Sequence, residues 1–128
     1  MVLTPDKEIL NNTIAFNGAN GIYIFTNEVN VSNNILHDND ANGIYLKGDN
    51  SQISQNSIYN NSENGINVNG SNVTVSKNIV NNNNSTGILV SGSYSNVSGN
   101  TVTNNKSKGI LISGDYADVS GNTVEYSN

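Results

Sequence analysis

The sequence predicts an all-β fold in which short parallel strands stack, coil upon coil, into a solenoid. Three observations predict it. A Gly-Ile pair recurs every 22 residues, aliphatic residues recur at fixed offsets from that pair, and Asn, Ser and Gly separate the aliphatic positions. A fixed period of this length is typical of architectures built from stacked repeats. We therefore expect a single domain over residues 1–128, built of about six coils.

The repeat has no insertion or deletion. Glycine followed by isoleucine stands at Gly21, Gly43, Gly65, Gly87 and Gly109. Counting each of these glycines as position 1, aliphatic residues occupy positions 2, 4, 11 and 16 of every copy. The predicted coils are residues 1–20, 21–42, 43–64, 65–86, 87–108 and 109–128.

Each coil is predicted to hold three short strands, at positions 2–5, 9–12 and 14–17. In the coil 21–42 these are residues 22–25, 29–32 and 34–37. Apolar and polar residues alternate in each stretch, which is typical of a half-buried strand. The small polar residues between the stretches mark turns. Because three is an odd number, an antiparallel meander would reverse every second copy. Parallel coils, about 4.8 Å apart and right-handed by the crossover rule, keep the columns aligned.

A leucine-rich repeat is the alternative, because its period overlaps and residues 29–36 imitate its core motif. The chain has only six leucines, however, and positions 2–5 form a second β-branched strand where that family places a helix or loop. We therefore favour the all-β solenoid.

Asparagine fills position 14 in all six copies, and we expect it to form a structural ladder of side-chain hydrogen bonds between coils. We also expect this residue to lie at a turn and to take the left-handed backbone conformation. Position 19 is predicted to form a second ladder. Glycine at position 6 of four coils is expected to supply a positive φ. The first ladder comprises Asn12, Asn34, Asn56, Asn78, Asn100 and Asn122, and the second comprises Asn17, Asn39, Asn61, Asn83 and Asn105.

The motif G-I-x-[VIL]-x-G-x-x-x-x-[VI]-S-x-N-x-[VIL] covers about residues 7–126. It resembles the repeat of right-handed, single-stranded parallel β-helices found in NosD-like periplasmic proteins and in the pectate-lyase-like superfamily, which includes pectin-degrading enzymes and alginate epimerases. The resemblance implies this fold and an extracellular or cell-surface location, although the chain as given carries no signal peptide. It does not select a function, because this fold serves catalysts, adhesins and spacers.

Composition excludes several classes of protein. All five basic residues are lysine and the net charge is −5, which argues against binding of nucleic acid. No apolar run is long enough for membrane insertion. Cysteine is absent, so disulfides and Cys-ligated metals are excluded. We expect no cofactor.

Catalytic residues are not evident. The resemblance implies that polysaccharide-active relatives use an arginine or lysine base with calcium, paired aspartates, or an Asp-Pro-His-Asp motif. The chain has no arginine and no Asp-Asp pair, and Pro5 is far from His37 in sequence. The only His-carboxylate cluster is His37, Asp38 and Asp40, which we interpret as a solvated turn. The alternative is a metal or catalytic site, because a hard cation such as Ca²⁺ could use its oxygens. The sequence therefore predicts a protein without enzymatic activity and without a metal site.

Aromatic residues form the most distinctive outward-facing group. Tyr23 and Tyr45 share position 3 of adjacent coils, Phe25 lies two residues along, and Tyr59 is predicted to stack on His37 at position 17. Flat rings beside amide and carboxylate groups suit the apolar face of a sugar. The alternative, which we favour, is that the rings support strand pairing. Tyr94 and Tyr116 at position 8 are predicted only to stack.

The ends of the chain show no capping segment, and bare strand edges favour association. Position 18 is Asp or Asn in the middle coils but Phe16 in the first and Tyr126 in the last. These two rings are predicted either to mediate end-to-end association or to plug their own ends. A structural, self-associating module is the favoured function and its partner a second copy. A carbohydrate-binding module with a polysaccharide partner, and a fragment of a polysaccharide lyase, hydrolase or epimerase, are the alternatives.

Overall fold

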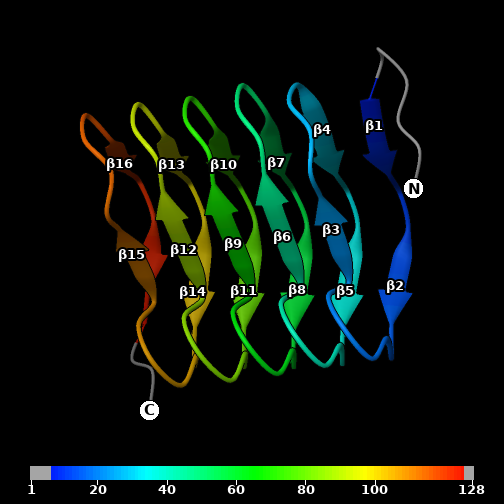
Figure 1. The fold of residues 1–128 in the computed structure, drawn as a ribbon. Helices are drawn as coiled ribbons and strands as arrows, with labels where there is room; N and C mark the ends of the chain where they lie inside the picture. Colours follow the sequence, from blue (N-terminus) through cyan, green and yellow to red (C-terminus); the bar gives the residue numbers. More distant parts are fainter. Residues whose placement is uncertain (1–6, 126–128) are drawn as a thin grey trace.

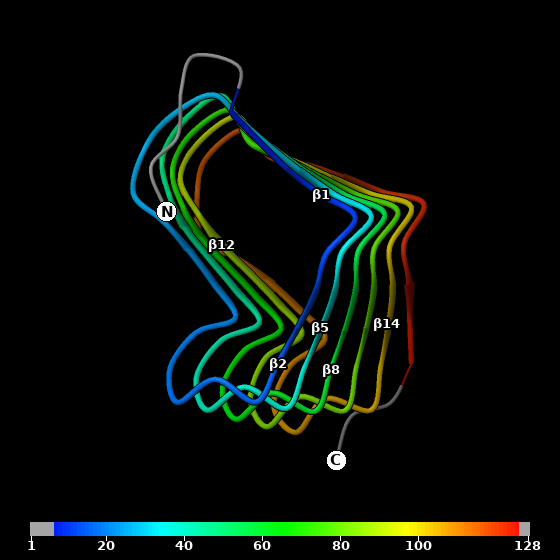
Figure 2. The same ribbon diagram turned by 90° about the vertical axis from the view of Figure 1, so that its right-hand side faces the viewer.

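The computed structural model describes residues 7–125, which wind as a solenoid of stacked coils with β1 (Lys7–Leu10) and β16 (Asp118–Ser120) at opposite ends of the stack (Figure 1). Seen along the stack, the coils have similar outlines and shift sideways in small steps from one coil to the next (Figure 2). The predicted all-β solenoid is therefore confirmed.

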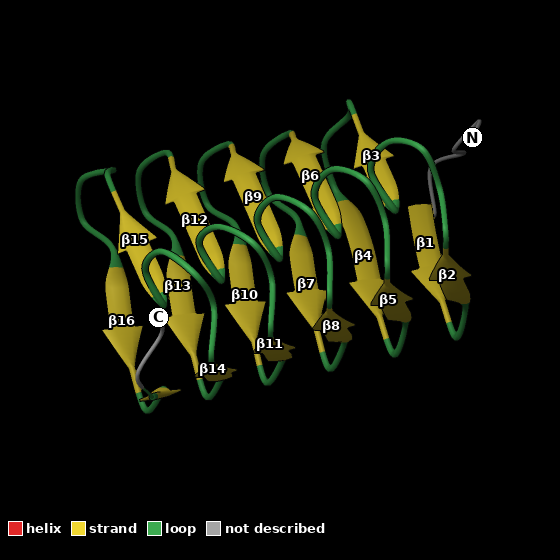
Figure 3. Ribbon diagram, turned by 90° about the horizontal axis from the view of Figure 1, so that it is seen from below, coloured by secondary structure: helices red, strands yellow, loops and turns green. Residues whose placement is uncertain are grey.

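Each coil from residue 21 onward contributes one strand to each of three sheets, and the described part of the first coil contributes one strand to two of them (Figure 3). Sheet A has six strands in the order β1-β4-β7-β10-β13-β16, sheet B has six in the order β2-β5-β8-β11-β14-β17, and sheet C has five in the order β3-β6-β9-β12-β15. Sheet A comprises β1 Lys7–Leu10, β4 Val29–Ser32, β7 Gln52–Ser54, β10 Thr74–Ser76, β13 Asn96–Ser98 and β16 Asp118–Ser120. Sheet B comprises β2 Thr13–Ala15, β5 Ile35–His37, β8 Ser57–Tyr59, β11 Ile79–Asn81, β14 Thr101–Thr103 and β17 Thr123–Val124. Sheet C comprises β3 Ile22–Ile24, β6 Ile44–Lys47, β9 Ile66–Asn69, β12 Ile88–Ser91 and β15 Ile110–Ile112.

All strand pairs are parallel and join residues one repeat apart, such as Tyr23 with Tyr45 in sheet C and Val31 with Ile53 in sheet A. This register keeps each sequence position in one column along the stack. Residues 7–125 contain no helix, and therefore none that is long and apolar enough to cross a membrane. The parallel prediction is confirmed, and the leucine-rich alternative does not hold.

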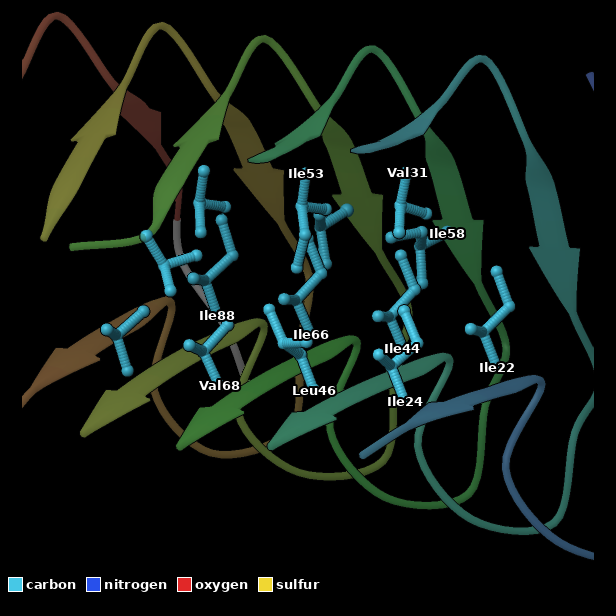
Figure 4. Packing of buried hydrophobic residues seen from close by; sticks show 14 of the residues in the cluster. Ile22, Ile24, Val31, Ile44, Leu46, Ile53, Ile58, Ile66, Val68 and Ile88 are labelled. Carbon is cyan, nitrogen blue, oxygen red and sulfur yellow. The ribbon is translucent and has the colours of Figure 1, made fainter. Parts of the chain in front are cut away.

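The core consists of aliphatic columns at positions 2, 4, 11 and 16, whose side chains point into the solenoid (Figure 4). Val29 and Val73, at position 9, are buried with them. In the middle coils these residues are fully buried, as at Ile44, Leu46, Ile53 and Ile58. Burying each such side chain contributes about 1.5–3 kcal/mol.

Each complete coil turns at three residues with positive φ, at positions 8, 13 and 18. In the coil 21–42 these are Glu28, Asn33 and Asp38. The prediction that the position-14 asparagines take this conformation is therefore wrong, since the residue before each of them does so. A single left-handed residue at position 13 turns the chain between sheets A and B.

Glycine at position 6 is required by close packing, and the expected positive φ is found only at Gly92 among these glycines. A Cβ at Gly70 would lie 1.9 Å from the Gly48 carbonyl oxygen. At position 1, a Cβ at Gly65 would lie 2.4 Å from Val80 Cγ1 and 2.8 Å from the Gly87 carbonyl oxygen. Both columns hold glycine where neighbouring coils touch backbone to backbone.

The position-14 asparagines form the predicted ladder. In the middle of the stack, Asn78 Nδ2 donates to Asn100 Oδ1 and to the Ile53 carbonyl oxygen, both at 3.0 Å. Its Oδ1 accepts from the backbone N–H and from Nδ2 of Asn56, also at 3.0 Å. Buried amides that satisfy all of these groups fix the register between coils.

The predicted second ladder at position 19 has the same pattern. Asn61 Nδ2 donates to Asn83 Oδ1 at 3.0 Å and to the Leu36 carbonyl oxygen at 3.4 Å. Both ladders run in one direction, because the N–H groups of each coil donate to Oδ1 of the next coil along the chain.

Candidate functional site

The outer face of sheet C carries a pair of tyrosines near the N-terminal end of the stack. Positions 2 and 4 of each strand point into the core, so position 3 points outward. Tyr23 on β3 and Tyr45 on β6 lie side by side, with ring centroids 5.3 Å apart and ring planes tilted by 43°. The rings form a cross-strand pair.

Phe25 and Lys47 flank this pair. Phe25 is 76% exposed. The Lys47 ammonium lies 5.5 Å from the centroid of the Tyr45 ring, which is within the range of a cation–π contact. We call Tyr23, Phe25, Tyr45 and Lys47 the aromatic face. Its rings can hold the apolar side of a ring-shaped ligand, and its ammonium can pair with an anionic group.

A second aromatic row lies on the outer face of sheet B. His37 on β5 and Tyr59 on β8 are stacked with centroids 4.9 Å apart and planes at 2°, as the sequence predicted. Phe16 approaches His37 edge-on at 5.5 Å. The predicted group of Tyr23, Phe25, Tyr45 and Tyr59 is therefore divided, because Tyr59 belongs to a different sheet.

The acidic turn beside this row is partly engaged. Asp38 Oδ2 lies 2.6 Å from His37 Nδ1, while Asp40 is exposed. No group of three His, Cys, Asp or Glu residues within 7–125 could hold a metal ion. Within residues 7–125 the turn therefore supplies one hydrogen-bond partner for His37.

Tyr94 and Tyr116 stack at position 8, with centroids 5.1 Å apart and planes at 11°. Both residues have positive φ and are largely exposed. The pair confirms the predicted stack.

The N-terminal end of the described solenoid opens into a cavity of about 580 Å³. Ile9 and Ile14 of the first coil line it together with residues 20–26, which include Tyr23 and Phe25 of the aromatic face. At the other end, Val119 and Val124 are 48% and 50% exposed, although their columns are fully buried one coil earlier at Val97 and Val102. Both ends of the described part therefore present apolar surface.

Phe16 does not plug its own end. It is 79% exposed, packs on His37, and is not among the residues packed against the core. Tyr126, the other ring assigned to the ends, lies outside the described residues. Self-association through Phe16 stays a prediction.

A third set of hydrogen bonds was not predicted. At position 22, Asn42 donates through its backbone N–H and Nδ2 to Asn20 Oδ1, and Asn64 donates likewise to Asn42 Oδ1. Asn42 Nδ2 also donates to Glu63 Oε2 at 3.3 Å. The signal was present in the sequence as Asn before Gly in three consecutive coils. This ladder runs in the opposite direction to the other two.

Comparison with known proteins supports the fold. A family profile described as a right-handed β-helix region matches residues 2–124. No curated protein matches the chain.

Two solved structures are similar to it. One is a mutant of the periplasmic alginate epimerase AlgG, with a TM-score of 0.63 and 20% identity. This match covers 91% of the chain and 34% of the AlgG structure. The other is the A-module of the mannuronan C-5 epimerase AlgE4 of Azotobacter vinelandii, with a TM-score of 0.54 and 14% identity. This match covers 94% of the chain and 56% of the module. At these identities the likeness shows a shared fold.

Proposed function

Because the chain belongs to the right-handed β-helix family, we propose that it is a non-catalytic structural module that associates with itself end to end. The observation that carries the proposal is the contrast between the sides and the ends of the solenoid. Between the ends of the stack, every strand pairs with a neighbour on both sides, so no edge strand lies there. The outermost described strands of each of the three sheets have one unpaired edge.

The sides also carry little that suits catalysis by the routes implied for polysaccharide-active relatives. The chain has no arginine, and the only described contact between an acidic and a basic side chain joins Asp38 Oδ2 to His37 Nδ1. We propose an extracellular or surface location, which is supported by the likeness to a periplasmic alginate epimerase.

Light scattering over a concentration series tests this function. The 128-residue chain has a mass of 13.6 kDa, and we expect the average mass to rise to multiples of that value as concentration increases. A mass that stays at one chain at high concentration contradicts the proposal.

A carbohydrate-binding surface is the second candidate, and the aromatic face favours it. Two tyrosine rings 5.3 Å apart and a lysine ammonium 5.5 Å from one of them suit an acidic sugar, whose apolar side can lie on a ring while its carboxylate pairs with Lys47. Both similar structures are named as epimerases of alginate or mannuronan. The third candidate, a piece of a polysaccharide lyase, hydrolase or epimerase, rests on those names alone.

Titration with acidic oligosaccharides, followed by tyrosine fluorescence, tests the second candidate. Tyr23→Ala combined with Tyr45→Ala should abolish the response, because it removes both stacking rings. Tyr94→Ala combined with Tyr116→Ala is the matched control, since that stacked pair lies on a turn at position 8 and should leave the response unchanged. Equal loss in both double variants contradicts the assignment of the aromatic face. Release of reducing or unsaturated ends from the polysaccharide would instead support the enzymatic candidate.

A further inference from the structure

The turns that lead from sheet B to sheet C lie in one row along the stack, at the lower edge of Figure 1. Between residues 38 and 108, the sign of their charge changes along the row. The turn 38–42 carries two aspartates, the turn 60–64 one glutamate, the turn 82–86 no charge, and the turn 104–108 two lysines. We call this row the charged edge. Its charged residues are, in order, Asp38, Asp40, Glu63, Lys106 and Lys108.

The acidic and basic parts of the charged edge do not neutralise each other. Three coil spacings place the turn 104–108 about 14 Å from the turn 38–42. This is longer than the ~8 Å over which exposed charges interact at physiological ionic strength. Asp40, Lys106 and Lys108 are exposed, and within residues 7–125 none of their side chains makes a described hydrogen bond or ion pair. These charges are therefore available to a partner.

The other two carboxylates are held in place by their neighbours. Asp38 Oδ2 lies 2.6 Å from His37 Nδ1, and Glu63 Oε2 accepts a hydrogen bond from Asn42 Nδ2 at 3.3 Å. Each contact engages one of the two carboxylate oxygens. The acidic half of the edge is therefore partly preorganised.

We propose that the charged edge of one copy binds the charged edge of a second copy in antiparallel orientation, so that the acidic part of each faces the basic part of the other. This lateral pairing is separate from the end-to-end association proposed above. Position 20, which is exposed in all four turns, shows the match. Asp40 lies opposite Lys106 of the other copy, and Ser62 lies opposite Asn84. The twofold symmetry of the pair makes each contact twice.

The orientation follows from the charges. A parallel pair in register would place Asp40 opposite Asp40 and Lys106 opposite Lys106, and like charges that face each other are unfavourable. A parallel pair shifted by three coils would bring Asp40 to Lys106 only once for each pair of chains. The antiparallel pair makes this contact twice and leaves no like charges opposed at position 20.

The pairing is expected to depend on salt, because exposed ion pairs are individually weak and are screened. Charges interact over about 30 Å at ~10 mM salt but only about 3 Å at ~1 M salt. End-to-end contact instead buries apolar surface, which salt does not screen. Measurements in ~1 M salt therefore report the end-to-end association alone, and the two kinds of association can fail independently.

Thiol cross-linking tests the orientation, because the chain has no cysteine. Ala41 and Ser107 share position 21 in the first and last turns of the charged edge, and they carry none of its charges. In the proposed pair they face each other across the contact, whereas within one chain they lie about 14 Å apart.

The variant with both Ala41→Cys and Ser107→Cys, treated in ~10 mM salt with a bismaleimide shorter than that distance, should give a dimer closed by two cross-links. Peptide mapping should join residue 41 of one chain to residue 107 of the other. Each single variant should remain monomeric on a denaturing gel, because identical residues lie three coils apart in the antiparallel pair. Circular dichroism before the reaction verifies that each variant is folded.

Charge reversal in the same double-cysteine chain tests the cause. Lys106→Glu combined with Lys108→Glu should abolish the cross-linked dimer, as should ~1 M salt. Lys47→Glu combined with Lys77→Glu is the matched control, because it makes the same change in net charge away from the charged edge. This control should retain the dimer.

Reciprocal rescue sharpens the test. Asp40→Lys combined with Glu63→Lys should also abolish the dimer, because it opposes lysine to Lys106. Mixing this chain with the one that carries Lys106→Glu and Lys108→Glu should restore a one-to-one pair, since opposite charges again face each other at position 20.

Four outcomes overturn the inference. Dimers of either single-cysteine variant indicate a parallel contact, and a series of trimers and longer chains from the double-cysteine variant indicates a shifted one. Equal loss of the dimer in the Lys47 and Lys77 control indicates an effect of net charge alone. An absence of cross-linked dimer in ~10 mM salt refutes lateral pairing but leaves the end-to-end association, measured in ~1 M salt, intact.

Discussion

Three residues in each complete coil hold the left-handed backbone conformation, and their identity varies more than their geometry. Position 13 is Asn11, Asn33, Gln55 and Lys77 before it becomes glycine at Gly99 and Gly121. Glutamine and lysine have no intrinsic preference for positive φ. The sequence therefore could not identify this column. The constant Asn at position 14 instead predicted the left-handed conformation at the neighbouring residue.

Lys77→Gly should stabilise the protein by about 1 kcal/mol, because a non-glycine residue costs about that much in the left-handed region. Lys77 is exposed and has a φ of 57°. Lys106→Gly, at an exposed turn residue without positive φ, is the matched control and should be neutral or destabilising. Denaturant melts of both variants measure the difference, and destabilisation by Lys77→Gly counts against this account of the turn.

Asn78→Ala should destabilise the protein by about 1–3 kcal/mol or more, because it leaves buried donors and acceptors without partners. Asn78 is fully buried and contacts the ladder on both sides. Asn84→Ala is the control, since Asn84 is exposed. Asn82 is less suitable, because its φ of 55° adds backbone strain to any alanine variant. Similar unfolding midpoints for both variants would remove the ladder from the explanation of stability.

At the scale of the strand and turn, the Gly-Ile pair marks where the chain enters sheet C. The backbone of each coil passes so close to the next that position 1 has no room for a side chain, and the following isoleucine points into the core. The sequence predicted the strands and inward columns correctly because their periodicity is that of the structure. It could not predict which outward aromatic residues share a face, since that depends on the angles between the sheets. The predicted aromatic group therefore combined Tyr59 of sheet B with Tyr23 and Tyr45 of sheet C.

Gly65→Ala should destabilise by about 3 kcal/mol, which is at the upper end of the usual cost of overpacking. Its Cβ would lie 2.4 Å from Val80 Cγ1 and 2.8 Å from a backbone oxygen that cannot move without disturbing the next coil. Gly18→Ala is the control, because nothing lies within 4 Å of the added atom. The comparison requires thermal or denaturant melts of both variants, and equal stability of the two contradicts the close approach.

At the scale of the whole molecule, each coil contacts the coils before and after it, so stability is the sum of similar units and similar junctions. This organisation could be predicted from the sequence, since the period is constant and every column continues through it. The state of the ends could not, because hydrogen-bond direction depends on which amide group of each asparagine faces which neighbour.

Deletion of residues 65–86 should leave a folded protein, because it removes one whole coil and rejoins Asn64 to Gly87 in the correct phase. The circular dichroism spectrum per residue should be unchanged, and the melting temperature should fall modestly. Deletion of residues 65–75 removes half a coil, disrupts every column and should abolish cooperative melting. If both deletions fold equally well, register between coils is not what holds the molecule together.

Small-angle X-ray scattering over a dilution series tests the central claim, growth by stacking of ends, most directly. The account predicts that the scattering mass and the maximum dimension rise with concentration, by roughly 25–30 Å for each added chain of six coils, while the cross-sectional radius of gyration stays constant. A cross-section that grows with the mass, or a mass that does not change with concentration, would contradict it.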